Sequence, residues 1–161
     1  MSRSRRSATA GSGSSLTLGA RVALRPLADG DATMSVGRGW GLDRGRAGDL
    51  PYEIVRRADG AVIGEVKGRA DDPAAGWLSV GSIAVAVGQR GWGYGSEAVR
   101  LLEARSGAER FRASVDAGNG LGLYFWLRLG YRPARPGEVP GRPSRGIITM
   151  VRVGQHMEPR T

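Results

Sequence analysis

The chain has 161 residues, which is enough for one domain with a substantial core. It holds no cysteine and one histidine, which excludes a disulfide framework and a thiolate site and argues against a histidine-rich metal site or a serine–histidine triad. The net charge is +9, with Lys67 as the one lysine; the richness in arginine, glycine and alanine is typical of a GC-rich bacterial genome and explains a high pI without bound nucleic acid.

The ends of the chain differ from its middle in composition. Residues 1–15 are rich in Ser, Arg and Gly and contain no apolar run, so we predict a disordered basic tail and no export signal. Residues 16–155 are predicted to form a single domain, and residues 156–161 a C-terminal tail. No segment is apolar over the length of a membrane span, so the expected location is the cytoplasm.

The first half of the domain is predicted to be an antiparallel meander. Arg21–Leu27 alternates apolar residues as a strand does. The glycine-rich segment 29–50 allows only short or broken helices. Tyr52–Arg57 and Ala61–Arg69 are strand-like, and the Asp-Gly between them predicts a hairpin.

The second half is predicted to alternate strands and helices. Leu78–Val87 is an apolar run that suits a buried central strand. A helix should follow, with one face made by Ala98, Val99, Leu101 and Leu102 and the other by Glu97, Arg100 and Glu103. Further strands are expected over Phe111–Val115, Tyr131–Pro133 and Gly146–Val153, and a second helix over Leu121–Leu129, ended by Gly130. The fold class is therefore α+β.

Three closely spaced glycines, Gly91, Gly93 and Gly95, stand between the predicted central strand and the helix. Unhindered N–H groups at a helix N-terminus form an anion site, and a pyrophosphate fits such a site. The alternative is that the glycines only make a tight turn. A P-loop is excluded because Ser96-Glu97 follows the last glycine. Gly93–Ala98 matches a dinucleotide fingerprint with Asp116 after the next strand, but the preceding hairpin is wrong for that fold, so it stays a minority alternative.

Two blocks resemble the GNAT superfamily of N-acetyltransferases. Arg90-Gly91-Trp92-Gly93-Tyr94-Gly95 is similar to the family's cofactor motif, and Asn119…Leu129-Gly130-Tyr131 is similar to its second conserved segment, at family spacing. The resemblance covers about residues 21–153. It implies a mixed, mostly antiparallel central sheet, flanked by helices and splayed at the central strands.

The resemblance also implies a cosubstrate site, and the residue composition predicts no metal. Acetyl-CoA would lie between the splayed strands, its pantetheine arm on the backbone of the central strand and beside Asn119, and its pyrophosphate on the glycine turn with Arg90 at the rim. The cofactor-binding residues so implied are Val85, Ala86, Val87, Gln89, Arg90, Gly91, Trp92, Gly93, Tyr94, Gly95, Ser96 and Asn119.

The catalytic groups are less determined. Trp126 occupies the position that often holds a general-acid tyrosine in the family. An indole cannot usefully donate a proton to the departing thiolate. Tyr124 is the candidate acid, although it is about 200° away around the helix and is expected to face elsewhere. A backbone N–H near Val85–Val87 could polarise the thioester carbonyl. Glu65 is the candidate base, with a solvated surface residue as its alternative.

The resemblance implies transfer of an acetyl group from acetyl-CoA to a primary amine, a small molecule or a peptide N-terminus, by direct attack in a ternary complex. The acidic segment 29–72, of net charge −2, is expected to form one wall of the acceptor groove. Two other classes stay open: a non-catalytic acetyl-CoA sensor, which Trp126 favours, and a nucleic-acid-binding protein, for which no motif is present. A homodimer also stays open.

Overall fold

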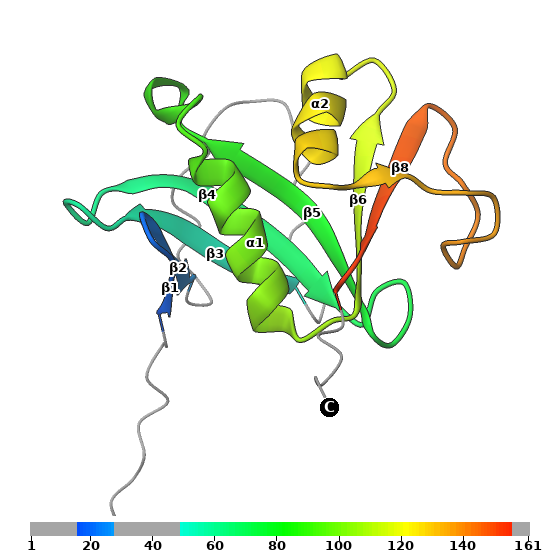
Figure 1. Cartoon of the computed structure of the whole chain (residues 1–161), viewed down its shortest axis with the longest axis horizontal. Helices are drawn as coiled ribbons and strands as arrows, with labels where there is room; N and C mark the ends of the chain where they lie inside the picture. Colours follow the sequence, from blue (N-terminus) through cyan, green and yellow to red (C-terminus); the bar gives the residue numbers. More distant parts are fainter. Residues whose placement is uncertain (1–15, 28–48, 156–161) are drawn as a thin grey trace, which may run out of the picture.

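The computed structural model describes residues 16–27 and 49–155, which build one sheet and two helices (Figure 1). The strands are β1 (Thr17–Leu18), β2 (Val22–Pro26), β3 (Asp49–Arg56), β4 (Val62–Ala70), β5 (Trp77–Val85), β6 (Arg110–Asp116), β7 (Arg132–Pro133) and β8 (Ile147–Val153), and the helices are α1 (Tyr94–Ser106) and α2 (Gly120–Arg128), with a 3-10 turn over Val87–Gln89. The eight strands lie in the order β1-β2-β3-β4-β5-β6-β8-β7. Among the described strands, β5 and β6 form the one parallel pair.

The predicted hairpin is confirmed. The backbone N–H of Gly60 donates to the Arg56 carbonyl at 2.8 Å and closes the turn. Gly60 has φ +74°, a left-handed conformation that few residues other than glycine adopt. An Arg56–Asp59 ion pair, with 2.5 Å between Nη2 and Oδ2, lies across the same turn. The hairpin β3–β4 therefore forms from a local connection, and β2, β3, β4 and β5 pair antiparallel in chain order, as the sequence indicated.

Both helices cover the same face of the sheet (Figure 1). Ala98, Val99 and Leu102 of α1 are buried in the core, as the helical period predicted. A Cβ at Gly68 of β4 would lie 3.0 Å from Leu102, so glycine at this position lets α1 approach the strand closely. The crossover β5–α1–β6 is the element that makes the parallel pair possible.

The central strands are splayed, which confirms the expected fold class. β5 and β6 are paired only from Trp77 to Val80, against Arg110 to Ala113. Beyond this point β5 continues with β4 as its neighbour, and β6 continues with β8. An opening therefore separates the second halves of β5 and β6. This strand order has no series of parallel strands, so it does not support the dinucleotide alternative.

Three details differ from the sequence predictions. The central strand ends at Val85, not Val87, because the chain turns there and the Gln89 N–H donates to the Ala86 carbonyl at 2.8 Å. The strand β1 was not predicted. Glu103, expected on the outer face of α1, is only 5% exposed.

The buried Glu103 is held by two partners. The Tyr131 hydroxyl donates to its Oε1 at 2.6 Å, and the Arg152 guanidinium donates to its Oε2. Burial, with the Glu103 carboxylate beside it, raises the pKa of the Tyr131 hydroxyl. This cluster ties α1 to the chain that follows α2 and to β8.

Candidate active site

A cleft of about 730 Å³ occupies the opening between β5 and β6, and its size is that of a ligand pocket. It is lined by Gly81, Ser82, Ile83, Val85, Gln89, Arg90, Gly91, Trp92, Gly93, Tyr94, Gly95, Ser96, Ser114, Val115, Asn119, Leu121, Gly122, Tyr124, Phe125, Trp126 and Arg128. The cleft thus brings together the glycine turn, the splayed strands and α2. Of the twelve residues that the resemblance implied, only Ala86 and Val87 do not line it.

The glycine turn has the backbone geometry that requires glycine. Gly91 and Gly93 have φ values of +83° and +81°. Gly93 is the N-cap of α1, and no side chain caps the helix there. The first N–H groups of a helix have no partner within it, so they are available to an anion in the cleft.

Gly95 has a different reason to be glycine. It lies within α1, and a Cβ there would stand 3.4 Å from Val85 Cγ2 and 3.5 Å from Phe125 Cε2. Both neighbours line the cleft. A side chain at this position would therefore occupy space in the cleft.

The backbone of residues 85–87 is already engaged within the chain. Arg90 Nε donates to the Val85 carbonyl at 2.8 Å, and the Ala86 N–H donates to the Ile63 carbonyl at 2.8 Å. The side chain of Val87 is 77% exposed. The part of β5 that borders the cleft lies earlier, from Gly81 to Val85.

Sequence reasoning missed the contact that fixes the glycine turn against β2. Glu97, in the first turn of α1, accepts from the backbone N–H groups of Arg21 at 2.7 Å and Val22 at 3.2 Å. Arg21 Nε donates to Glu97 Oε2 at 3.1 Å, and its Nη1 donates to the Trp92 carbonyl at 2.6 Å. Partial burial opposes ionisation of Glu97, but the Arg21 and Val22 bonds outweigh it and lower its pKa. Arg21 and Glu97 are 76 positions apart, so no local pattern could reveal the contact.

The turn before α2 holds Asn119 in place. Asn119 is the N-cap of α2, and its Oδ1 accepts from the Gly122 N–H at 2.9 Å. Asp116 Oδ1 accepts from the Gly118 N–H at 2.8 Å, as expected of a turn residue. Asn119 lines the cleft from this position.

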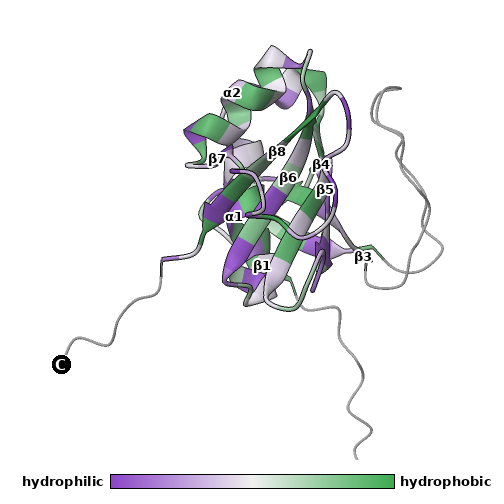
Figure 2. Ribbon diagram, turned by 90° about the vertical axis from the view of Figure 1, so that its right-hand side faces the viewer, coloured by the Kyte–Doolittle hydropathy of each residue, from purple (hydrophilic) through white to green (hydrophobic). Residues whose placement is uncertain are grey.

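Aromatic side chains form the wall of the cleft on α2. Trp126 is buried, with ring centroids 5.1 Å from Phe125 and 4.8 Å from Tyr131. Tyr124 is 59% exposed yet lines the cleft, so the expectation that it faces elsewhere was wrong. Figure 2 shows that much of α2 is apolar. The exposed Leu121 adds to the same rim.

Glu65 lies on the other side of the sheet. It alternates with Val66, which is buried under α1, so its side chain is on the face opposite the helices. Glu53 of β3 is its cross-strand neighbour. Burial and the Glu53 charge raise the pKa of Glu65, while Lys67 opposes the change. Glu65 does not line the cleft.

Other predictions fall outside the cleft or outside the description. Trp77 is buried and Trp92 is 65% exposed in the cleft, whereas Trp40 lies outside the described residues. The tails and residues 29–48 of the acidic segment 29–72 also lie outside them. Of that segment, Asp72 pairs with Arg112 at the start of β5, away from the cleft.

The described residues offer neither a metal-binding cluster nor a membrane-spanning helix. No group of three or more His, Asp or Glu side chains there could hold a metal ion. Within the same residues, neither helix has the length and apolar character needed to cross a membrane.

Comparisons with known proteins agree with this geometry. A model of the acetyltransferase (GNAT) family matches residues 28–131. None of the curated proteins matches the chain. A probable GNAT-family acetyltransferase from Chromobacterium violaceum is similar over 95% of this chain and 96% of its own, with TM-score 0.64 and 17% identity.

Two further solved structures are similar over a smaller part. An acetyltransferase from Thermus thermophilus shares 18% identity and TM-score 0.55, over 66% of this chain and 65% of its own. A Bacillus subtilis acetyltransferase in complex with CoA shares 14% identity and TM-score 0.52, over 67% of this chain and 78% of its own. At such identities these structures support the fold alone. With its family match and its splayed sheet, the chain belongs to the GNAT acetyltransferase family.

Proposed function

We propose that this protein transfers an acetyl group from acetyl-CoA to a primary amine of a small molecule or a peptide N-terminus. The observation that carries the proposal is one cleft that joins the splayed edge of β5 to the uncapped, glycine-rich start of α1. The edge of β5 suits an extended amide-containing arm, and the start of α1 suits a pyrophosphate. The similar Bacillus subtilis acetyltransferase was solved with CoA, which agrees with this ligand.

Each step of the acetyl transfer can be assigned to a group in or near the cleft. A backbone N–H of β5 between Gly81 and Val85 would polarise the thioester carbonyl. The acceptor nitrogen forms a bond to that carbon while the carbon–sulfur bond breaks. The Tyr124 hydroxyl, or water, gives a proton to the thiolate that leaves. Glu65, whose side chain lies on the sheet face opposite the helices, would take the proton of the amine through water if the acceptor enters from that face.

Binding of acetyl-CoA tests the site. Gly95→Val should weaken the Kd by about tenfold or more, because the side chain fills part of the cleft. Ala104→Val is the matched control: it puts the same side chain at an exposed position of the same helix and should leave the Kd unchanged. Equal binding by the two variants, measured by calorimetry, would refute the site assignment.

Turnover separates the enzyme from the second candidate, an acetyl-CoA sensor. The buried Trp126, at the position that often holds a tyrosine, favours a sensor. Release of free thiol from acetyl-CoA should be followed with a panel of amines, with Tyr124→Phe and Glu65→Gln beside the parent chain. Tight binding without thiol release for any amine would favour the sensor. We expect the enzyme to act in the bacterial cytoplasm on a small-molecule or peptide amine, as a monomer or a homodimer.

A further inference from the structure

A second hollow, of about 580 Å³, adjoins the cleft. It lies between the turn before β2, the first turns of α1 and the end of α2, and it is lined by Gly19, Ala20, Arg21, Gly93, Ser96, Glu97, Arg100, Leu101, Arg128 and Leu129. Gly93, Ser96 and Arg128 line both hollows. A ligand that passes the start of α1 can therefore extend from one hollow into the other.

The second hollow is strongly basic. Three arginines, Arg21, Arg100 and Arg128, line it, with Glu97 as the one acid of its lining. Arg21 and Glu97 neutralise each other through their ion pair. Arg100 and Arg128 have no carboxylate partner among the described residues. The lining thus keeps two uncompensated positive charges.

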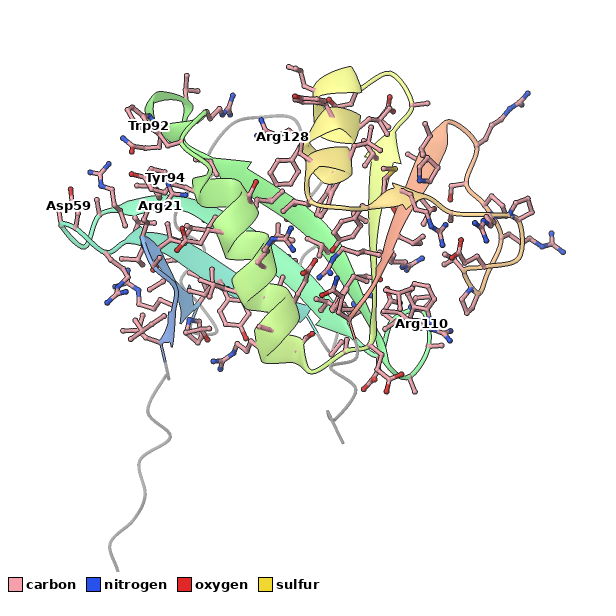
Figure 3. The ribbon with its side chains drawn as sticks, in the orientation of Figure 1. Arg21, Asp59, Trp92, Tyr94, Arg110 and Arg128 are labelled. Atoms are coloured by element: carbon pink, nitrogen blue, oxygen red, sulfur yellow. The ribbon has the colours of Figure 1, made fainter. Side chains whose placement is uncertain are left out.

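Both uncompensated guanidinium groups are oriented by the end of α2. Arg100 Nη2 donates to the Leu129 carbonyl at 3.2 Å, which uses only part of its donor capacity. The Arg128 guanidinium lies 5.7 Å from the centroid of the Tyr124 ring. Figure 3 shows Arg21 and Arg128 on opposite sides of the start of α1.

We propose that this hollow, the arginine hollow, binds the 3′-phosphate of CoA and selects CoA over ligands that lack this group. The proposal rests on the proposed function, which puts the pyrophosphate at Gly93 and Ser96. A phosphate monoester carries up to two negative charges at pH 7, and a guanidinium group offers paired donors to its oxygens. Arg100 and Arg128 match that charge where a ligand leaves the cleft.

The test compares CoA with 3′-dephospho-CoA in calorimetric titrations of the full chain. The parent chain should bind CoA about tenfold more tightly, the effect of one or two charged hydrogen bonds at a partly exposed site. Arg100→Gln, which affects the arginine hollow and not the cleft, should weaken the binding of CoA and leave the Kd for dephospho-CoA unchanged. In the double variant Arg100→Gln/Arg128→Gln, the ratio of the two Kd values, dephospho-CoA to CoA, should fall to near one.

Arg110→Gln is the charge-matched control, since Arg110 lies at the far end of the sheet (Figure 3). The ratio of its Kd values for dephospho-CoA and CoA should equal that of the parent chain. Equal binding of both ligands by the parent chain, or an unchanged ratio in the double variant, would overturn the proposal. If the parent chain binds neither ligand, the proposed function itself fails, and the two failures are thereby distinguished.

Discussion

Ser96 stands where helix stability and ligand binding make opposite demands. It is the third residue of α1 and lines both hollows. Ser96→Asp should stabilise the helix by about 0.3–1 kcal/mol, because a negative charge interacts favourably with the helix N-terminus. The same charge should repel phosphates and weaken acetyl-CoA binding. Thermal melting and calorimetry measure the two effects on one sample.

Ser96→Asn is the neutral control for that prediction. It keeps a polar side chain of similar size without the charge, and it should bind acetyl-CoA more tightly than Ser96→Asp. If Ser96→Asp binds acetyl-CoA as the parent chain does, no phosphate lies at the start of α1.

The buried Glu103 should matter for stability and not for binding. Glu103→Gln removes the charge that compensates Arg152, whose side chain is only 20% exposed. We expect a loss of about 3 kcal/mol in the free energy of unfolding by urea. Tyr131→Phe removes one hydrogen bond and should cost about 1 kcal/mol. A Glu103→Gln chain as stable as Tyr131→Phe would show that the ion pair contributes little.

At the scale of elements, Glu97 joins α1 to β2 through backbone bonds, and this contact should depend on pH. The folded-state pKa of Glu97 is lowered, so its stabilisation is complete above the unfolded value of ~4.3 and is lost as pH falls through the folded value. Glu97→Gln should therefore be less stable at pH 7 and lose less stability between pH 5 and pH 3. Urea unfolding at each pH measures the difference.

The parent chain, unfolded at the same pH values, is the reference. If Glu97→Gln follows the parent curve, the contact does not stabilise the fold.

The sequence predicted most elements because their signals are local. Gly60 and Asp59 mark the hairpin, and Asn119 and Gly130 mark the two ends of α2. The end of β5 was placed too late because Val87 is apolar although exposed. Apolar character alone cannot distinguish a strand residue from one in a turn that follows it.

The candidate site was predictable to the same extent. The glycine turn is a contiguous pattern, so the sequence identified it. The residues of the arginine hollow come from three segments, near Arg21, Arg100 and Arg128, and only the fold brings them together. Glu103 was placed on the outer face of α1 for the same reason, since its partners lie 28 and 49 positions later in the chain.

For the whole molecule, the domain should not depend on its N-terminal tail. Residues 1–15 carry no periodic apolar residues that could join the core. A chain that begins at Ser15 should keep the melting temperature and the Kd for acetyl-CoA. A melting temperature lower by several degrees would show that the tail packs on the domain.

The sheet consists of two groups of strands, β1 to β5 and β6 to β8, which are joined by the short β5–β6 pairing. β5 is bonded to β4 over seven residue pairs and β6 to β8 over seven, but β5 meets β6 over only four. A force that pulls the two groups of strands apart should separate β5 from β6 starting at the end where they are not paired. We expect a molecule bound in that gap to contact both groups of strands and to raise the force needed to separate β5 from β6.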